Sequence, residues 1–219
     1  VGDAVILANT TLLGGHVTDQ DLELAARIGA ACGARVAVET FPTRLPWGAG
    51  HATCEKIPYI PEFALEHLKT VRRLVLVGAQ APASFFAYPN LPGRLTHEEC
   101  EFVTLAEPHH DRIDALERLA QAVHAQAAEP PRNPRALPAL AEAGALSTAA
   151  VGDIIAALLP EQAIVVDEGI TGGFDVFART RTARAHEWIM QTGGSIGWGL
   201  PAATGAAIAA PGRKVVWLE

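Results

Sequence analysis

The chain has few charged residues, few cysteines and no long apolar run, and each shortage excludes a class of protein. Charged residues make up only 19% of its 219 residues, and the net charge of −7 comes without a basic cluster, which argues against a nucleic-acid partner. Three cysteines form no CxxC pair, so reduced thiols in a cytoplasmic protein are expected rather than disulfides or a zinc site. No apolar run approaches the roughly 20 residues of a spanning helix, and no signal peptide opens the chain. No membrane partner is therefore expected.

Apolar residues are abundant and arranged in alternating elements. They make up 49% of the chain, which is enough for a large core and too much for a disordered protein. Strands are expected at 4–8, 35–39, 73–78, 101–105, 163–167 and 186–189, and helices at 18–32, 62–69, 111–126 and 148–159. The alternation predicts an α/β fold whose parallel sheets are covered by helices on both faces.

A proline-rich segment divides the chain into two predicted domains. Residues 129–146 contain four prolines and little periodicity, which is typical of a linker. Residues 1–128 are predicted to form a Rossmann-like parallel-sheet domain, and 147–219 part of a second doubly wound α/β domain. Because the chain opens on Val1 and stops within an expected strand, it is expected to be a fragment of a longer polypeptide.

Two glycine-rich turns stand out in the second domain. One follows the strand 163–167 and runs over 168–173, and the other runs over 192–199 before a helix that begins near Pro201. In open α/β sheets, ligands bind at the carboxyl ends of the strands. Two such turns side by side would offer backbone N–H groups to a phosphate.

These segments resemble the thiamine-diphosphate-dependent enzymes. The likeness rests on Asp167–Thr171, Gly193–Ala203 and Lys214–Leu218, and within the family it is greatest to the acetolactate synthase and benzoylformate decarboxylase group. The resemblance implies that 1–128 is the family's middle domain and that 147–219 is the first half of its diphosphate-binding domain. It also implies a lyase or transferase that decarboxylates or ligates 2-keto acids.

The resemblance assigns roles to individual residues. Ile196 matches the apolar residue that bends the coenzyme and brings its two rings together. Gly194 matches the residue whose carbonyl accepts a hydrogen bond from the pyrimidine amine, and these two positions are the implied catalytic ones. The implied cofactor-binding set is Gly169, Ile170, Thr171, Gly193, Gly194, Ser195 and Ile196.

The resemblance also implies that some functional groups of the family lie outside this sequence. The family's Mg²⁺ site uses a Gly-Asp-Gly after the strand that here holds Trp217, and the chain stops at Glu219. The Mg²⁺ ligands and the glutamate that activates the pyrimidine are therefore expected outside this sequence, and the 219 residues alone are expected to be inactive. Glu168 is expected to be a turn residue rather than a general base. The intact protein is expected to be a homodimer or homotetramer, because the family's coenzyme lies between subunits.

One alternative from a different class remains open. Leu13-Gly14-Gly15 lies between a strand and a helix, and Glu39 ends the next strand, as in a partial dinucleotide motif. A Rossmann-like nucleotide-binding module without catalysis would fit this pattern, and some relatives bind FAD in the middle domain. The motif is not GxGxxG, so a structural turn is favoured over an FAD site.

Overall fold

The computed structural model describes residues 10–140 and 144–219, which form two compact units. The first unit contains the chain up to Thr40 together with Ala52–Pro131. The second contains Phe41–His51 together with the chain from Arg132 onward. The predicted linker 129–146 spans the boundary at Pro131, but the assignment of family domains to 1–128 and 147–219 stays a prediction.

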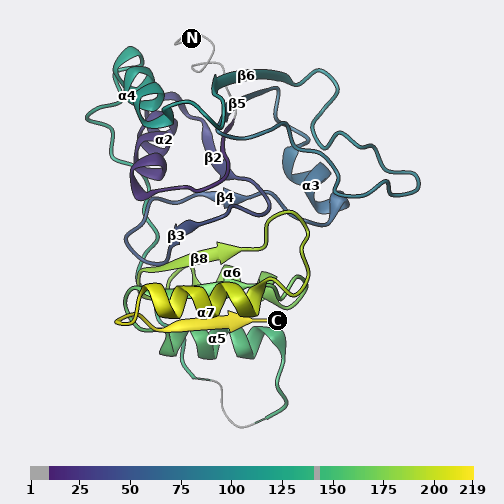
Figure 1. The fold of residues 1–219 in the computed structure, drawn as a ribbon. Helices are drawn as coiled ribbons and strands as arrows, with labels where there is room; N and C mark the ends of the chain where they lie inside the picture. Colours follow the sequence, from purple (N-terminus) through teal and green to yellow (C-terminus); the bar gives the residue numbers. More distant parts are fainter. Residues whose placement is uncertain (1–9, 141–143) are drawn as a thin grey trace. The chain divides into compact units, whose positions relative to one another are not determined.

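The first unit is a parallel sheet with helices on both faces (Figure 1). Five strands run in the order β4-β2-β1-β5-β6, and every neighbouring pair is parallel. Helices α2 and α4 lie against each other, and α3 packs into the core on the other side of the sheet. The bounds are β1 Thr10–Leu13, β2 Arg35–Val38, β4 Glu55–Lys56, β5 Arg73–Val77, β6 Glu101–Ala106, α2 Asp19–Cys32, α3 Pro61–Leu68 and α4 Arg112–Ala122.

The ends of α2 follow directly from the sequence. Thr18 and Asp21 form a capping box, in which each side chain accepts a hydrogen bond from the other residue's backbone N–H. Gly33 ends the helix in the left-handed conformation at φ 72°, which a glycine adopts without steric cost. The helix therefore spans the region predicted from its cap and its glycine stop.

The second unit contains a four-stranded sheet in the order β3-β8-β7-β9. Strands β7, β8 and β9 are parallel, whereas β3 joins β8 antiparallel. In Figure 1, α7 lies in front of this sheet, with α5 and α6 behind it. The bounds are β3 Leu45–Trp47, β7 Ala163–Asp167, β8 His186–Met190, β9 Val215–Leu218, α5 Thr148–Leu158, α6 Gly173–Thr180 and α7 Gly199–Ala209.

Residues on successive positions of these strands point to opposite faces. Ile164 and Val166 of β7 form a buried cluster with Ala203 of α7. On the other face, Trp188 of β8 meets the ring of Phe177 in α6 edge to face, with centroids 5.2 Å apart. The period-2 alternation therefore separates an α7 face from an α6 face.

Strand β3 is held to the second unit by aromatic and ionic contacts. The Trp47 ring stacks on Phe177 at a centroid distance of 4.2 Å, and its Nε1 donates to the Phe177 carbonyl at 2.9 Å. The guanidinium of Arg44 pairs with the Glu187 carboxylate in a two-point contact. These contacts explain why Phe41–His51 belongs to the second unit although it interrupts the first in sequence.

The α/β fold class predicted from the sequence is confirmed, with several local corrections. The strand expected at 4–8 lies outside the described residues. The first described strand, β1 at Thr10–Leu13, occupies positions that follow the expected strand and were expected to be a loop. No element was expected between the strand 35–39 and the helix 62–69, but β3 and β4 lie there; they are too short for an alternation pattern to reveal.

One buried histidine gives the second unit a pH-dependent stability. His186 is 2% exposed, its Nδ1 lies 2.7 Å from the Arg184 carbonyl oxygen, and its Nε2 is buried without a hydrogen-bond partner among the described residues. Burial lowers the pKa of His186 from 6.5 to about 4, and this effect outweighs the hydrogen bond to Arg184, which raises the pKa. The imidazole is therefore neutral in the folded protein at pH 7.

We expect the free energy of unfolding to fall as the pH is lowered from about 6.5 to about 4. In that window the unfolded chain binds a proton at His186 that the folded chain does not bind, so protonation favours unfolding. The limiting contribution is roughly 3 kcal/mol. Denaturant titrations at several pH values should show this decline in the protein and a shallower one in His186→Phe. His109→Gln, a change at an exposed histidine, is the control and should keep the full decline.

Candidate active site

Two turns of the second unit meet at one edge of its sheet. Asp167 is the last residue of β7, and it pairs with Met190 of β8 on one side and with Leu218 of β9 on the other. Because these strands are parallel, the segments that follow β7 and β8 leave the sheet at the same edge. These segments are 168–172 and 191–198, which contain all seven predicted cofactor-binding residues.

A buried carboxylate joins the two turns. Glu168 is 8% exposed, and its side chain accepts hydrogen bonds from the backbone N–H groups of Gly197 and Gly199, the latter at 2.6 Å. Its own backbone N–H donates to the Leu218 carbonyl at 2.8 Å. Hydrogen bonds to an ionised group are stronger than neutral ones. Glu168 therefore fixes the second turn against the ends of β7 and β9.

Glycine is required at Gly199 because the chain approaches other groups closely there. A Cβ built on Gly199 would lie 2.5 Å from Glu168 Oε2 and 2.4 Å from Trp217 Nε1. Any side chain at this position would push the loop away from the carboxylate. The glycine thus lets the carboxylate reach the N–H groups at the start of α7.

The exposed part of the second turn has a left-handed backbone. Gly193 and Gly194 have φ values of 71° and 66°, which favour glycine. The Gly194 carbonyl accepts the Ile196 N–H at 3.2 Å, and the Ser195 carbonyl accepts the Trp198 N–H at 3.2 Å. No atom lies within 4 Å of a Cβ built on Gly193 or Gly194. The turn is therefore ordered by its own hydrogen bonds and open on its outer side.

Ile196 projects from this turn instead of packing into the core. Its side chain is 89% exposed. An exposed large apolar side chain on a turn held by backbone hydrogen bonds is available to a ligand with an apolar face. The position is therefore compatible with the role that the resemblance implies for Ile196.

The first turn is organised by Asp167. Its Oδ1 accepts the Gly169 N–H at 3.0 Å, and its Oδ2 accepts Trp188 Nε1 at 3.3 Å. Ile170 is half-buried and Thr171 is exposed beyond it. The structure thus brings Gly169–Thr171 and Gly193–Ile196 to one sheet edge, while their contact with a ligand stays a prediction.

The described residues fit thiamine diphosphate better than they fit a metal ion. The open space beside Gly193 and Gly194 leaves room for a ring, and the buried Nε2 of Gln191, next to the turn, has no hydrogen-bond partner within residues 10–140 and 144–219. Over the same residues, no group of three or more His, Cys, Asp and Glu side chains is arranged to hold a metal.

No helix in the described part of the chain has the length and hydropathy needed to cross a membrane.

The partial dinucleotide motif of the first unit is filled by contacts within the chain. The Gly15 N–H donates to Glu39, whose pKa is raised because burial outweighs this hydrogen bond. Arg112 donates to the Gly14 carbonyl at 3.0 Å and pairs with Asp21 at 2.9 Å. Asp21 places a carboxylate at the α2 N-terminus, where a phosphate would otherwise be favoured. These contacts favour the structural-turn interpretation over an FAD site.

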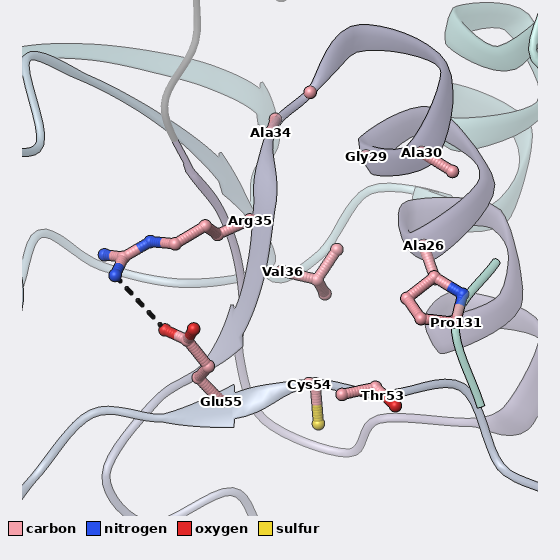
Figure 2. A pocket seen from close by; sticks show the side chains of 11 residues that line it. Ala26, Gly29, Ala30, Ala34, Arg35, Val36, Thr53, Cys54, Glu55 and Pro131 are labelled. Atoms are coloured by element: carbon pink, nitrogen blue, oxygen red, sulfur yellow. Dashed lines mark ion pairs between the residues drawn. The ribbon is translucent and has the colours of Figure 1, made fainter. Parts of the chain in front are cut away.

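The first unit also contains a cavity of about 350 Å³ (Figure 2). Small side chains of α2 line one side of it, and Arg35 and Glu55 form an ion pair at 3.5 Å near its rim. Arg35 is the first residue of β2, so the cavity lies at the amino end of that strand. Ligands of α/β sheets bind at the opposite end, so this cavity is not the predicted site.

Two solved structures with the same fold are described as thiamine-diphosphate-dependent enzymes. A 4-hydroxybenzoylformate decarboxylase of Rhodococcus jostii aligns with 99% of this chain, and the alignment covers 44% of the decarboxylase chain. The TM-score is 0.72 and the sequence identity is 21%. A Mycobacterium smegmatis protein, described as a thiamin diphosphate-dependent enzyme, also aligns with 99% of this chain, and the alignment covers 46% of that protein's chain. The TM-score is 0.69 and the sequence identity is 23%. At these identities, the matches establish the fold class alone.

Sequence relatives extend the comparison from fold to family. A Mycobacterium tuberculosis protein, whose name assigns it to the acetolactate synthase large subunits as IlvX, is 47% identical over 209 residues, covering 95% of this chain. Benzoylformate decarboxylase of Pseudomonas aeruginosa is 36% identical over 102 residues, 46% of this chain and 19% of its own length. No family model matches the chain. The chain is therefore similar to thiamine-diphosphate-dependent enzymes of the acetolactate synthase and benzoylformate decarboxylase group, and it spans 40% of the length of the IlvX protein.

The sequence predicts Glu168 as a turn residue, but it does not predict the hydrogen bonds that the Glu168 carboxylate accepts. The Asp-Glu-Gly sequence after β7 predicted a turn, which is correct, but the partners of the carboxylate lie about thirty positions later, at Gly197 and Gly199. Such a long-range contact depends on the register of β7 and β8. The available signal was an acidic residue directly after an apolar strand.

We expect Glu168→Gln to loosen the second turn. The glutamine can accept at one oxygen only, so one of the two glycine N–H groups would face an amide NH₂, and the free energy of unfolding should fall by about 1–3 kcal/mol. Amide hydrogen exchange should accelerate at Gly197 and Gly199. Glu161→Gln, at an exposed residue before β7, should change neither quantity. Unchanged exchange in Glu168→Gln would contradict the role of the carboxylate.

Proposed function

We propose that this chain forms one wall of a thiamine-diphosphate site in an enzyme that decarboxylates or ligates 2-keto acids. The observation that carries the proposal is the open turn Gly193–Gly197, which Glu168 holds and on which Ile196 is exposed, at the same sheet edge as the Gly169–Thr171 turn. The sequence relatives support it, since one is named a benzoylformate decarboxylase and the other an acetolactate synthase large subunit. The alternative, a nucleotide-binding module without catalysis, is not favoured by these relatives.

In this proposal the chain orients the coenzyme. Thiamine diphosphate, when bound, supplies the electron sink that decarboxylation of a 2-keto acid requires. The Ile196 side chain would support the coenzyme between its rings, and the Gly194 carbonyl would accept a hydrogen bond from the pyrimidine amine. The Gly194 oxygen already accepts the Ile196 N–H and keeps a second lone pair for that contact.

The first turn would bind the diphosphate of the coenzyme, and the start of the second turn would flank its rings. Gly169, Ile170 and Thr171 would contact the diphosphate, because backbone N–H groups at the carboxyl edge of a parallel sheet suit anionic oxygens. Since the Gly169 N–H already donates to Asp167, the N–H groups offered would be those of Ile170 and Thr171. Gly193 and Ser195 would flank the ring site. Glu168 would act through the backbone of the second turn, as a positioning residue without a proton-transfer role.

The wider properties of the enzyme belong to the same proposal. Mg²⁺ would neutralise the diphosphate, with ligands from outside these 219 residues, and either lyase or transferase chemistry fits the two relatives. The 219 residues by themselves would be inactive, since IlvX is more than twice as long as the matched region. A homodimer or homotetramer in the cytoplasm completes the proposal.

We expect Ile196→Ala to weaken thiamine diphosphate binding by about 10- to 30-fold. The substitution removes three carbon groups, about two of which would be buried against the coenzyme, worth roughly 1.6 kcal/mol. Isothermal titration calorimetry with thiamine diphosphate and Mg²⁺, on the natural full-length protein, would measure the change in Kd.

The matched control is Ile208→Ala. Ile208 is also an exposed isoleucine, at 77%, but it lies in α7 away from the turn. Its substitution should leave the Kd unchanged. Equal affinities of Ile196→Ala and the unsubstituted protein would show that the turn does not hold the coenzyme, and FAD or NAD binding in place of thiamine diphosphate would favour the alternative function.

A further inference from the structure

The Nε2 of Gln191 is buried without a hydrogen-bond partner among residues 10–140 and 144–219. Gln191 is 3% exposed and directly follows Met190, the last residue of β8. Its Nε2 has no partner within the described part of the chain. A buried amide that has lost its hydrogen bonds to water is destabilising, so natural proteins contain few of them. The amide therefore indicates an acceptor that the described residues do not supply.

Gln191 lies at the carboxyl edge of the sheet, beside Glu168. Asp167 and Met190, the last residues of β7 and β8, are paired. Glu168 and Gln191, which directly follow them, therefore lie at the same level along the two strands. Side chains alternate along β8, and Ile189 packs on the α7 face. Continuing this alternation one residue past the end of β8 places Gln191, two positions after Ile189, toward the same face, and Gln191 leads directly into the Gly193–Gly197 turn.

The neighbouring carboxylate does not satisfy this amide. Both oxygens of Glu168 accept backbone N–H groups from the second turn, one from Gly197 and one from Gly199. The other unpartnered groups of comparable burial belong to Thr11, Asp21 and His186. Thr11 lies inside β1, the Asp21 carboxylate in α2 pairs with Arg112, and His186 is the first residue of β8. Gln191 is thus the one of these four that adjoins the proposed coenzyme site.

We propose that Gln191 is a further binding residue of this site, whose Nε2 donates a hydrogen bond to a phosphate oxygen of thiamine diphosphate. The inference rests on the proposed function. Glu168, at the level of Gln191, leads directly into the Gly169–Thr171 turn, the proposed diphosphate contact. An anionic oxygen is the strongest acceptor available to a neutral amide. Burial already restricts the side chain, so little entropy is lost when the bond forms.

Gln191→Met tests the inference through two opposite effects. Methionine has a similar size and no polar N–H group, so it removes the unpaired amide from the unliganded protein and the donor from the complex. The midpoint of thermal unfolding without coenzyme should rise. The Kd for thiamine diphosphate with Mg²⁺ should weaken by about 10- to 100-fold, as expected for a lost hydrogen bond to a charged group.

The control is Gln121→Met, at an exposed glutamine of α4, which should change neither quantity. A lower unfolding midpoint for Gln191→Met would mean that the amide is satisfied in the unliganded protein and would overturn the inference. An unchanged Kd would overturn it as well. If that result accompanies a weakened Kd in Ile196→Ala, the proposed function stands and only the role of Gln191 falls. If the unsubstituted full-length protein does not bind the coenzyme, both fall.

Discussion

The buried carboxylate of Glu168 is the constraint on which the site depends. It holds the N–H groups of Gly197 and Gly199 at the carboxyl edge of the sheet and leaves Ile196 exposed at 89%. Without it, the second turn would be fixed only by its own short backbone hydrogen bonds. A turn rich in glycine loses much conformational entropy on ordering. The two hydrogen bonds accepted by the Glu168 side chain offset part of that loss, so the turn that carries Ile196 is held before a ligand arrives.

In this arrangement the sheet positions the two turns, and the turns carry the groups that we propose for contact with the coenzyme. Strands β7, β8 and β9 fix the starting points of the turns through their register, and α7 covers one face of the sheet through Ala203. The groups that we propose for contacts with the coenzyme differ in kind: a carbonyl at Gly194, an exposed apolar side chain at Ile196 and a buried amide at Gln191. A coenzyme with an aromatic amine, two rings and a diphosphate has a matching group for each.

Much of the fold could be predicted from the sequence, because its elements carry local signals. The capping residue Thr18 and the glycine stop at Gly33 bound α2, and the apolar run 163–167 gave β7. Strand β3 could not be predicted, because Leu45–Trp47 is three residues long and depends on Phe177 and Glu187. The turns 168–173 and 192–199 were identified from glycine and resemblance. The contacts of Glu168 and the burial of Gln191 depend on strand register, which local sequence does not encode.

The most direct measurement of the central claim is a crystal structure of the natural full-length protein with thiamine diphosphate and Mg²⁺. The account predicts that the Ile196 side chain contacts both rings of the coenzyme while the Glu168 carboxylate still accepts the N–H groups of Gly197 and Gly199. A coenzyme bound elsewhere, or a second turn that has left Glu168 in the complex, would contradict it.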